Sequence, residues 1–436
     1  MRAREHLPHT VAGLALLVVA TSPSGLRAAT STVSEARQPA GDLSALGVEP
    51  LLPDLGDDSG DDFRLRVYGF ADFTLSRTFL PEGSGFEAFV VDKSTFYVGA
   101  LNTYFDSSFD DWKSLIEIRF LYLPHGSPVA DGRVDTTVVD YADIYRDVRY
   151  GSIEIERAWV EYQVARWLTI RAGQWLTPYG VWNVDHASPT IIGARRPYVI
   201  AEELLPERQT GLQFIGSFDV GRTTVGYHLT VSNGRGPVDA YLDFDENKAL
   251  GARLFVDAPT IDLKAGVSAY YGRFTSLSEE TRLDAERILV TERTLAEQFD
   301  ELSLAADLKW TWSHLIVQAE VVVNQRRYTE GGRPLNPADV QTLTPDQTLS
   351  GAYGLVAYET PLFGITPYAM VEYEKGRINL LRISGAWGFT GGLNWRPHPR
   401  VTLKAQVLVS KQLGDASSPF TNTTITLADG QIAWAF

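Results

Sequence analysis

From about residue 64 to the C-terminus, the sequence alternates between apolar and polar residues, and no stretch is apolar enough to form a membrane-spanning helix. Within residues 222–233, for example, Val225 and Tyr227 lie on one side of an extended chain, whereas Thr224 and His228 lie on the other. A period of two is typical of a strand with one apolar and one polar face. The chain is therefore expected to be all-β.

The alternation recurs in about sixteen segments, each close to the 9 to 11 residues that a tilted strand needs to cross a bilayer. The expected strands lie near residues 64–78, 93–105, 113–123, 152–164, 167–177, 209–219, 222–233, 247–257, 261–273, 301–312, 315–326, 350–360, 363–374, 385–395, 401–410 and 427–436. Long connections of roughly 10 to 31 residues alternate with short ones of roughly 1 to 6, as in outer-membrane barrels with long outside loops and short periplasmic turns.

The alternation and the loop lengths together predict a transmembrane antiparallel β-barrel of about 16 strands over residues 63–436. Hydrocarbon cannot hydrogen-bond free backbone groups, so strands that cross a bilayer must close on themselves. Trp310, Trp312 and Trp395 fall on the apolar face near strand ends, where an interfacial aromatic girdle is expected. A large soluble β-sandwich also alternates and is the competing interpretation.

The N-terminus predicts export. Arg2 and Arg4 precede a short apolar run over residues 11–20, which indicates a signal peptide over residues 1–20, with cleavage as late as Ala29 as an alternative. Residues 21–62 are rich in Pro, Gly, Ser and acidic residues, and we expect a flexible acidic leader there.

Composition excludes several classes of function. The chain has no cysteine, so thiolate metal sites, cysteine nucleophiles and disulfides are excluded. A formal net charge of -15 has the wrong sign for coating nucleic acid. We expect no nucleic-acid partner, no cofactor and no metal site.

Several short motifs resemble Gram-negative outer-membrane porins of the phosphate-selective porin O and P type. These motifs are Gly69-Phe70-Ala71-Asp72-Phe73, Ala158-Trp159-Val160-Glu161-Tyr162, Ile170-Arg171-Ala172-Gly173-Gln174, Pro178-Tyr179-Gly180, Val231-Ser232-Asn233-Gly234-Arg235-Gly236 and Gly392-Leu393-Asn394-Trp395-Arg396-Pro397. The resemblance, over about residues 64–436, implies a homotrimeric porin whose third outside loop, about 177–209, folds inward. The chain lacks the dense Arg and Lys runs of those porins, so the resemblance does not extend to phosphate selectivity.

The terminal Phe436, on an alternating strand, resembles the signal read by the barrel assembly machinery. This machinery and outer-membrane lipid are therefore expected partners, and the outer membrane of a Gram-negative bacterium is the expected location.

The inward face of the expected barrel carries ten cations against six acids, although the whole chain is acidic. A basic lumen favours anions because field lines focus in a narrow pore. The expected pore-lining or solute-binding residues are Arg119, Arg157, Arg171, Arg195, Arg196, Arg208, Arg253, Lys264, Glu117, Glu161 and Glu320. The alternative is that these charges pair along single strands, as Glu117 with Arg119, Glu161 with Arg157, and Asp307 with Lys309.

Two catalytic alternatives are not favoured. Asp185 beside His186, or His228 with Thr230 and Ser232, supply acid, imidazole or hydroxyl groups, but neither set has a converging partner. We therefore expect no catalytic residues.

Two loops leave other structural possibilities open. The acidic loop Asp243, Asp245, Glu246 and Asn247 supplies oxygen ligands of the kind that calcium takes, although a solvated hairpin is the simpler expectation. In the segment Leu277 to Leu302, apolar residues recur at partly helical spacing, so a short helix in the fifth outside loop is an alternative.

The function expected from the sequence is passive diffusion of small polar solutes and ions, with a modest preference for anions, phosphate-type anions among them. The alternative is an outer-membrane receptor, adhesin or structural barrel with a plugged lumen.

Overall fold

The computed structural model describes residues 63–88, 93–122, 150–183, 187–201, 204–236, 244–283, 289–337, 339–361, 363–376 and 381–436. The expected signal peptide and acidic leader, residues 1–62, lie outside the described residues, as do Asp185, His186 and Asp243. Within the described residues, no helix is long and apolar enough to cross a membrane.

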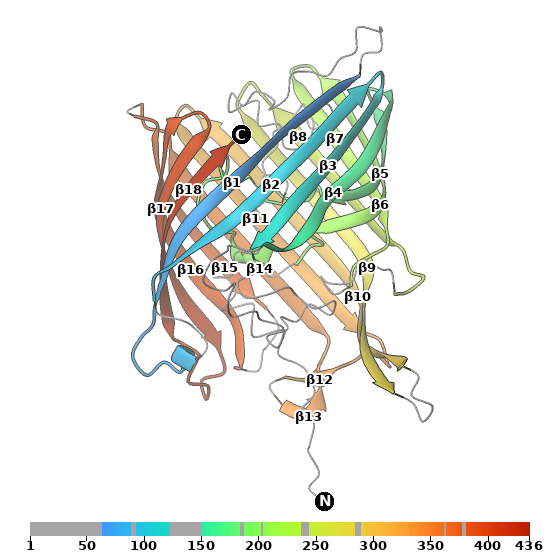
Figure 1. Ribbon diagram of the computed structural model, residues 1–436, viewed down its shortest axis with the longest axis vertical. Coiled ribbons are helices and arrows are strands. Elements are labelled where there is room, and N and C mark those ends of the chain that lie inside the picture. Colours follow the sequence, from blue (N-terminus) through green and yellow to red (C-terminus); the bar gives the residue numbers. More distant parts are fainter. Residues whose placement is uncertain are drawn as a thin grey trace, which may run out of the picture.

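Sixteen strands form one closed antiparallel barrel, which confirms the predicted fold class (Figure 1). The strands are β1 Arg64–Phe79, β2 Thr95–Phe109, β3 Trp112–Tyr122, β4 Tyr150–Ala165, β5 Leu168–Leu176, β6 Arg208–Val220, β7 Thr223–Ser232, β8 Ala249–Ala258, β9 Leu263–Leu283, β10 Leu289–Trp312, β11 Leu315–Tyr328, β14 Gln347–Tyr358, β15 Ile365–Lys375, β16 Ile383–His398, β17 Val401–Gly414 and β18 Thr424–Ala435. Each strand pairs with its neighbours in sequence, and β1 closes the barrel against β18, with Phe73 opposite Ile432.

The polar residues of the alternating pattern face the barrel interior, and the apolar residues face outward. In β11, Gln318, Glu320 and Asn324 are buried against the interior, whereas Val321 and Val323 are exposed on the outer surface. The outer surface is thus apolar and the inner surface polar, as a barrel in lipid requires.

Aromatic side chains lie on the outer surface at the end of the barrel that carries the short turns. Trp312 and Trp395 are 66% and 44% exposed, and the rings of Trp310 and Trp312 stack with their centroids 6.2 Å apart. The rings of Trp112 and Tyr162, near the first two short turns, are tilted by 44° with their centroids 4.8 Å apart. The positions predicted for an interfacial girdle are therefore confirmed.

Connections at one end of the barrel are short. Two-residue turns at 110–111, 166–167, 221–222, 313–314 and 399–400 join successive strands. Gly221 has a φ of 67°, a left-handed conformation that glycine adopts at little cost in so tight a turn.

The fifth outside connection is a hairpin rather than the short helix that the apolar spacing of Leu277 to Leu302 left open. β9 continues to Leu283, β10 begins at Leu289, and Leu277 pairs with Leu295. Extending an existing ladder adds backbone hydrogen bonds residue by residue, whereas a helix would first need its own unfavourable nucleus. A second outside hairpin, β12 Leu335–Asn336 with β13 Asp339–Leu343, lies between β11 and β14.

Candidate functional site

The loop between β5 and β6, residues 177–207, lies inside the barrel and is called L3 below. Its first half reaches strands on several sides of the wall. Tyr179 bonds to Thr230 of β7 over 3.0 Å between hydroxyl oxygens, and the Trp182 backbone N–H donates to Glu320 of β11 at 2.6 Å. The chain of L3 therefore extends across the interior instead of staying beside its own strands.

Further along L3, the contacts move to the opposite part of the wall. Ser188 donates to Asp72 of β1 at 2.6 Å, and Lys404 of β17 donates to the Gly193 carbonyl at 2.6 Å. The Ala194 backbone N–H donates to Gln406 of β17 at 2.8 Å.

The last part of L3 contains a single helical turn, α3 Tyr198–Ala201. The Tyr198 backbone N–H donates to Glu372 of β15 at 2.7 Å, and the Leu204 carbonyl accepts from Ser303 of β10 at 2.7 Å. None of the described residues of L3 is exposed. L3 thus narrows the lumen and is held by polar contacts around much of its circumference.

One contact of L3 requires a glycine. Gly180 has a φ of 76°, and a Cβ atom there would lie 2.0 Å from the Glu320 carboxylate. Because the same carboxylate accepts from the Trp182 backbone N–H, any larger residue at this position would displace the first half of L3.

Arg195 forms a bidentate ion pair between L3 and the wall. Its guanidinium donates twice to Asp429 of β18, with Nε to Oδ2 at 2.5 Å and Nη2 to Oδ1 at 2.7 Å, and Nη2 also donates to Ser76 of β1 at 3.0 Å. Burial disfavours the charged guanidinium, but the hydrogen bonds and charge of Asp429 outweigh burial and raise the pKa of Arg195. This bidentate geometry is the strong form of the Arg–carboxylate contact.

A network of charges covers the inner face of β3 and β4. Arg157 contacts Glu117 at 2.5 Å, and Arg119 contacts Glu156 at 3.0 Å. Arg208, the first residue of β6, contacts Glu154 and lies 3.5 Å from Glu156.

The remaining predicted cations are paired as well. These pairs are Arg171 with Glu161 at 2.6 Å, Arg196 with Glu207 at 3.5 Å, Arg253 with Asp307 at 2.9 Å, and Lys264 with Asp257 at 4.0 Å. All eleven residues predicted to line the pore therefore lie on the inner wall or in L3, and all eight cations among them are within 4.0 Å of a carboxylate. The same-strand pairs predicted as the alternative are wrong for Arg157 and Glu161, because both bond to neighbouring strands instead.

The described wall carries more carboxylates than the sequence-based count. Seven further inward carboxylates stand against four further inward cations, Lys113, Arg208, Arg235 and Arg396, so the predicted surplus of four cations falls to one. The added carboxylates are Asp106, Glu154, Glu156, Asp257, Glu301, Glu374 and Asp429.

A β-bulge explains why Glu154 and Glu156 were missed. In the pairing of β3 with β4, Glu117 faces Arg157 whereas the next residue, Ile118, faces Ile155, so Glu156 is an extra residue. The bulge places Glu156 and Arg157 side by side on the inner face, and a strict period of two assigns only one of them to it.

The catalytic alternative built on His228 has no support in the geometry. His228 is buried in the wall and contacts Gln213 at 3.1 Å, whereas the Ser232 hydroxyl donates to Gln209 at 2.8 Å. The described residues contain no group of three His, Cys, Asp or Glu side chains that would hold a metal ion. In the acidic loop, Asp245 accepts hydrogen bonds from the Asn247 backbone and from Thr275.

Phe436 lies where the barrel closes. Its backbone exchanges two hydrogen bonds with Gly69 of β1, at 2.8 and 2.9 Å. A Cβ atom at Gly69 would lie 2.7 Å from the Phe436 ring, so the absence of a side chain at Gly69 makes room for the terminal aromatic group.

The overall structure is similar to solved outer-membrane proteins. The outer membrane channel DcaP of Acinetobacter baumannii superposes with a TM-score of 0.52 at 12% identity, covering 88% of this chain and 100% of that one. An anion-selective porin from Comamonas acidovorans gives 0.52 at 10% identity, with coverage of 86% and 100%. OmpF of Salmonella typhi, solved with daunomycin, gives 0.51 at 13% identity, with coverage of 86% and 98%.

No family model matches the chain, and no curated protein matches it. At identities this low, the structural likeness establishes the fold: a closed barrel of the kind found in Gram-negative outer-membrane porins.

Proposed function

We propose that the protein is an outer-membrane channel through which small polar solutes and ions diffuse. The observation that carries this proposal is the combination of an apolar outer surface, a polar inner surface and an inward loop that narrows the lumen. Diffusion needs a wet path, a narrow point and contacts weak enough to release the solute. The porin fold of its structural neighbours agrees with this role.

We also propose weak selectivity between anions and cations. A guanidinium that already faces a carboxylate presents little net field to a passing ion, and exposed charges are further screened by salt. The anion preference expected from the sequence therefore stays a prediction, and its expected size is small.

Solute flux into liposomes tests the proposal. Vesicles that contain the purified protein are placed in iso-osmotic solutions of neutral sugars of increasing size, and swelling is followed by light scattering. We expect rapid swelling with the smallest sugars and a sharp cut-off with size, because L3 narrows the lumen. Vesicles that contain correctly folded protein but swell no faster than empty vesicles would refute a diffusion channel.

A reversal potential measured in a salt gradient tests selectivity separately. We expect a reversal potential close to zero, with a small displacement in the direction that indicates anion selectivity. Neutralising Arg119, Arg157 and Arg171 together should move it towards cation selectivity, because each substitution leaves a carboxylate unpaired. An unchanged potential would show that these side chains do not line the conducting path.

One observation favours a second candidate function, a receptor or structural barrel with a closed lumen. Every described residue of L3 is at least half-buried, and its contacts reach β7 and β11 on one side of the barrel and β1 and β17 on the other. In that case the outside hairpins would bind the partner and the liposomes would not swell.

Location and assembly are parts of the same proposal. We propose that the chain is exported by its N-terminal signal peptide and inserted into the outer membrane with Phe436 as the assembly signal. We also propose a homotrimer, which chemical crosslinking of the detergent-solubilised protein tests by the appearance of a threefold-mass band.

A further inference from the structure

Exposed cations face outward at the outside end of the barrel wall. They are Arg77 of β1, Arg327 of β11, Lys375 of β15 and Lys411 of β17, and each lies within three residues of the strand end that leads into a long connection. Each shares its face with an exposed apolar residue two or four positions away, namely Leu75, Val323, Val371 and Val409. Positive charge therefore lies on the lipid-facing side of a chain whose net charge is -15.

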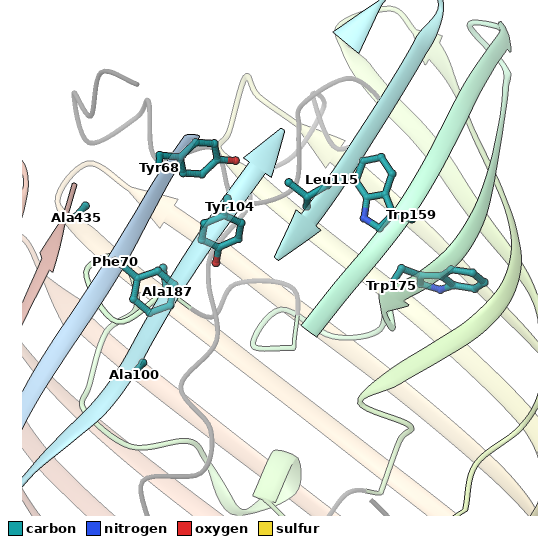
Figure 2. Close-up of a cluster of buried hydrophobic side chains, with 9 residues drawn as sticks. All are labelled: Tyr68, Phe70, Ala100, Tyr104, Leu115, Trp159, Trp175, Ala187 and Ala435. Carbon is teal, nitrogen blue, oxygen red and sulfur yellow. The ribbon is translucent and has the colours of Figure 1, made fainter. Parts of the chain in front are cut away.

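Cations on the inner wall, in contrast, are covered by the protein itself. Figure 2 shows the buried cluster on that side, which includes Tyr104 and Trp159. The guanidinium of Arg157 lies 5.5 Å from the centre of the Tyr104 ring. That of Arg171 lies 3.9 Å from the centre of the Trp159 ring, and both guanidinium groups also pair with carboxylates. The inner-wall cations therefore have their partners within the chain.

The outward cations differ in this respect. Among the described residues, no carboxylate lies within 4.0 Å of Arg77, Lys375 or Lys411. At the short-turn end, exposed cations and acids are mixed, and Arg166 pairs with Asp219 at 2.7 Å. Because the chain has a large excess of carboxylates and places none beside these three cations, the geometry indicates an anion that comes from outside the chain.

The three cations lie on one sector of the wall, since β15, β16, β17, β18 and β1 are successive neighbours (Figure 1). Lys411 is opposite Trp387 of β16, and Trp387 is opposite Tyr373 of β15, with ring centroids 4.7 Å apart. Lys375 follows Tyr373 by two residues. With about 4.8 Å between strands and about 3.4 Å per residue, the Cα atoms of Lys375 and Lys411 are roughly 12 Å apart.

Arg77 lies on β1, two strands beyond Lys411. Its guanidinium is 4.8 Å from the centre of the Phe79 ring, and both side chains are exposed. The sector thus combines three cations with three rings, and these residues are called the basic outer patch: Arg77, Phe79, Tyr373, Lys375, Trp387 and Lys411.

A phosphorylated lipid headgroup has the chemistry that matches this patch. Aromatic rings at a membrane interface lie at the level of the headgroups, so cations beside them lie at the level of the headgroup phosphates. Arginine can donate two parallel hydrogen bonds to a phosphate, and lysine contributes a compact positive charge on a flexible stem. A free anion would use the cations alone, whereas a lipid uses the rings as well.

We propose that the basic outer patch binds the phosphate groups of a lipid in the outer leaflet, with acyl chains against the rings and the apolar wall below them. The proposal rests on the outer-membrane location proposed above and names the chemistry of the lipid partner. It does not require that the barrel conducts.

Titration of the detergent-solubilised full-length protein with lipid A, an acylated disaccharide that carries phosphate groups, tests the binding. Bound lipid is counted by native mass spectrometry. We expect Lys375→Gln combined with Lys411→Gln to weaken binding at least tenfold, because both cations reach the same headgroup region. Arg166→Gln combined with Arg222→Gln is the matched control: it removes two exposed cations at the short turns and should change binding less than twofold.

Dephosphorylated lipid A provides a second readout. It should bind the unmodified protein at least tenfold more weakly than lipid A, and it should bind the Lys375→Gln, Lys411→Gln variant about as well as the unmodified protein. All substituted side chains are exposed, so heat-modifiable gel migration should show the same folded barrel in each variant.

The outcomes separate this proposal from the channel proposal. Equal binding of lipid A to the unmodified protein and to the Lys375→Gln, Lys411→Gln variant would overturn the lipid site. Displacement of lipid A by an equal concentration of inorganic phosphate would also overturn it, because a free anion would then suffice. Neither result affects the channel, since solute flux is measured in phosphatidylcholine vesicles without lipid A. Phosphate-dependent lipid binding by a protein that does not conduct would support the lipid site while refuting the channel.

Discussion

The contact between Arg195 and Asp429 should control how firmly L3 is held across the lumen. Asp429→Asn keeps the shape of the side chain but removes its charge, so one of the two guanidinium contacts, at 2.5 and 2.7 Å, loses its acceptor. Breaking a buried ion pair by changing one partner costs about 3 to 5 kcal/mol. The Arg195 side chain is 11% exposed and keeps its bond to Ser76, so we expect a cost below this range, about 2 to 3 kcal/mol.

This loss should appear in the mobility of L3 rather than in the stability of the barrel. At about 1.4 kcal/mol for each factor of ten, a loss of 2 to 3 kcal/mol raises the fraction of molecules with L3 detached by about 30- to 150-fold. Single-channel recordings of Asp429→Asn should therefore show additional openings of higher conductance, and L3 should become more sensitive to protease.

Asp219→Asn is the matched control. Asp219 pairs with Arg166 at 2.7 Å near a short turn, but both side chains are at least half exposed, and such pairs contribute little. The reasoning would be refuted if both variants conduct like the unmodified protein and L3 stays equally resistant to protease. It would also be refuted if Asp429→Asn unfolds the barrel at much lower urea while L3 stays attached.

Three other changes test other parts of the structure. Glu117→Gln leaves the buried Arg157 without its charged partner and should lower the free energy of unfolding in urea titrations by about 2 to 4 kcal/mol; no change would show that water satisfies that guanidinium. Phe436→Ala should reduce the yield of folded protein in the outer membrane severalfold, as assessed by heat-modifiable gel migration, and an undiminished yield would contradict its assembly role. Val321→Arg, on the outer surface, should cost about 2 to 4 kcal/mol in lipid vesicles, whereas Gln318→Arg, on the inner face of the same strand, should cost much less; equal costs would contradict the assigned faces.

Much of the barrel follows from the sequence because each strand has to satisfy two different surroundings at once. Val321 and Val323 could be assigned to the outside, and Glu320 and Asn324 to the inside, from their order alone. Because successive side chains point to opposite faces, a period of two produces this separation in any strand that lies between lipid and a polar interior.

The sequence is less informative wherever pairing between strands decides the outcome. The contact of Arg157 with Glu117 joins residues forty positions apart, and nothing in the local pattern distinguishes it from the same-strand alternatives. The bulge at Glu156 is equally hidden, because the register of β3 against β4 creates it. The bulge accounts for two of the carboxylates that reduce the predicted basic excess, Glu154 and Glu156.

The contacts made by L3 are a third feature that the sequence does not encode locally. The pairs Ser188 with Asp72 and Arg195 with Asp429 join residues that become neighbours only when the barrel closes. The length of the connection indicates a large loop, but its route across the interior depends on the assembled wall.

Electrical recording from single molecules in a planar bilayer tests the central claim most directly. The purified full-length protein, shown to be folded by heat-modifiable gel migration, is added to one side of the membrane under an applied voltage. We predict discrete, uniform steps of current as each barrel inserts. Stable insertion of folded protein, demonstrated by labelling the membrane-bound material, without any steps of current would contradict the account.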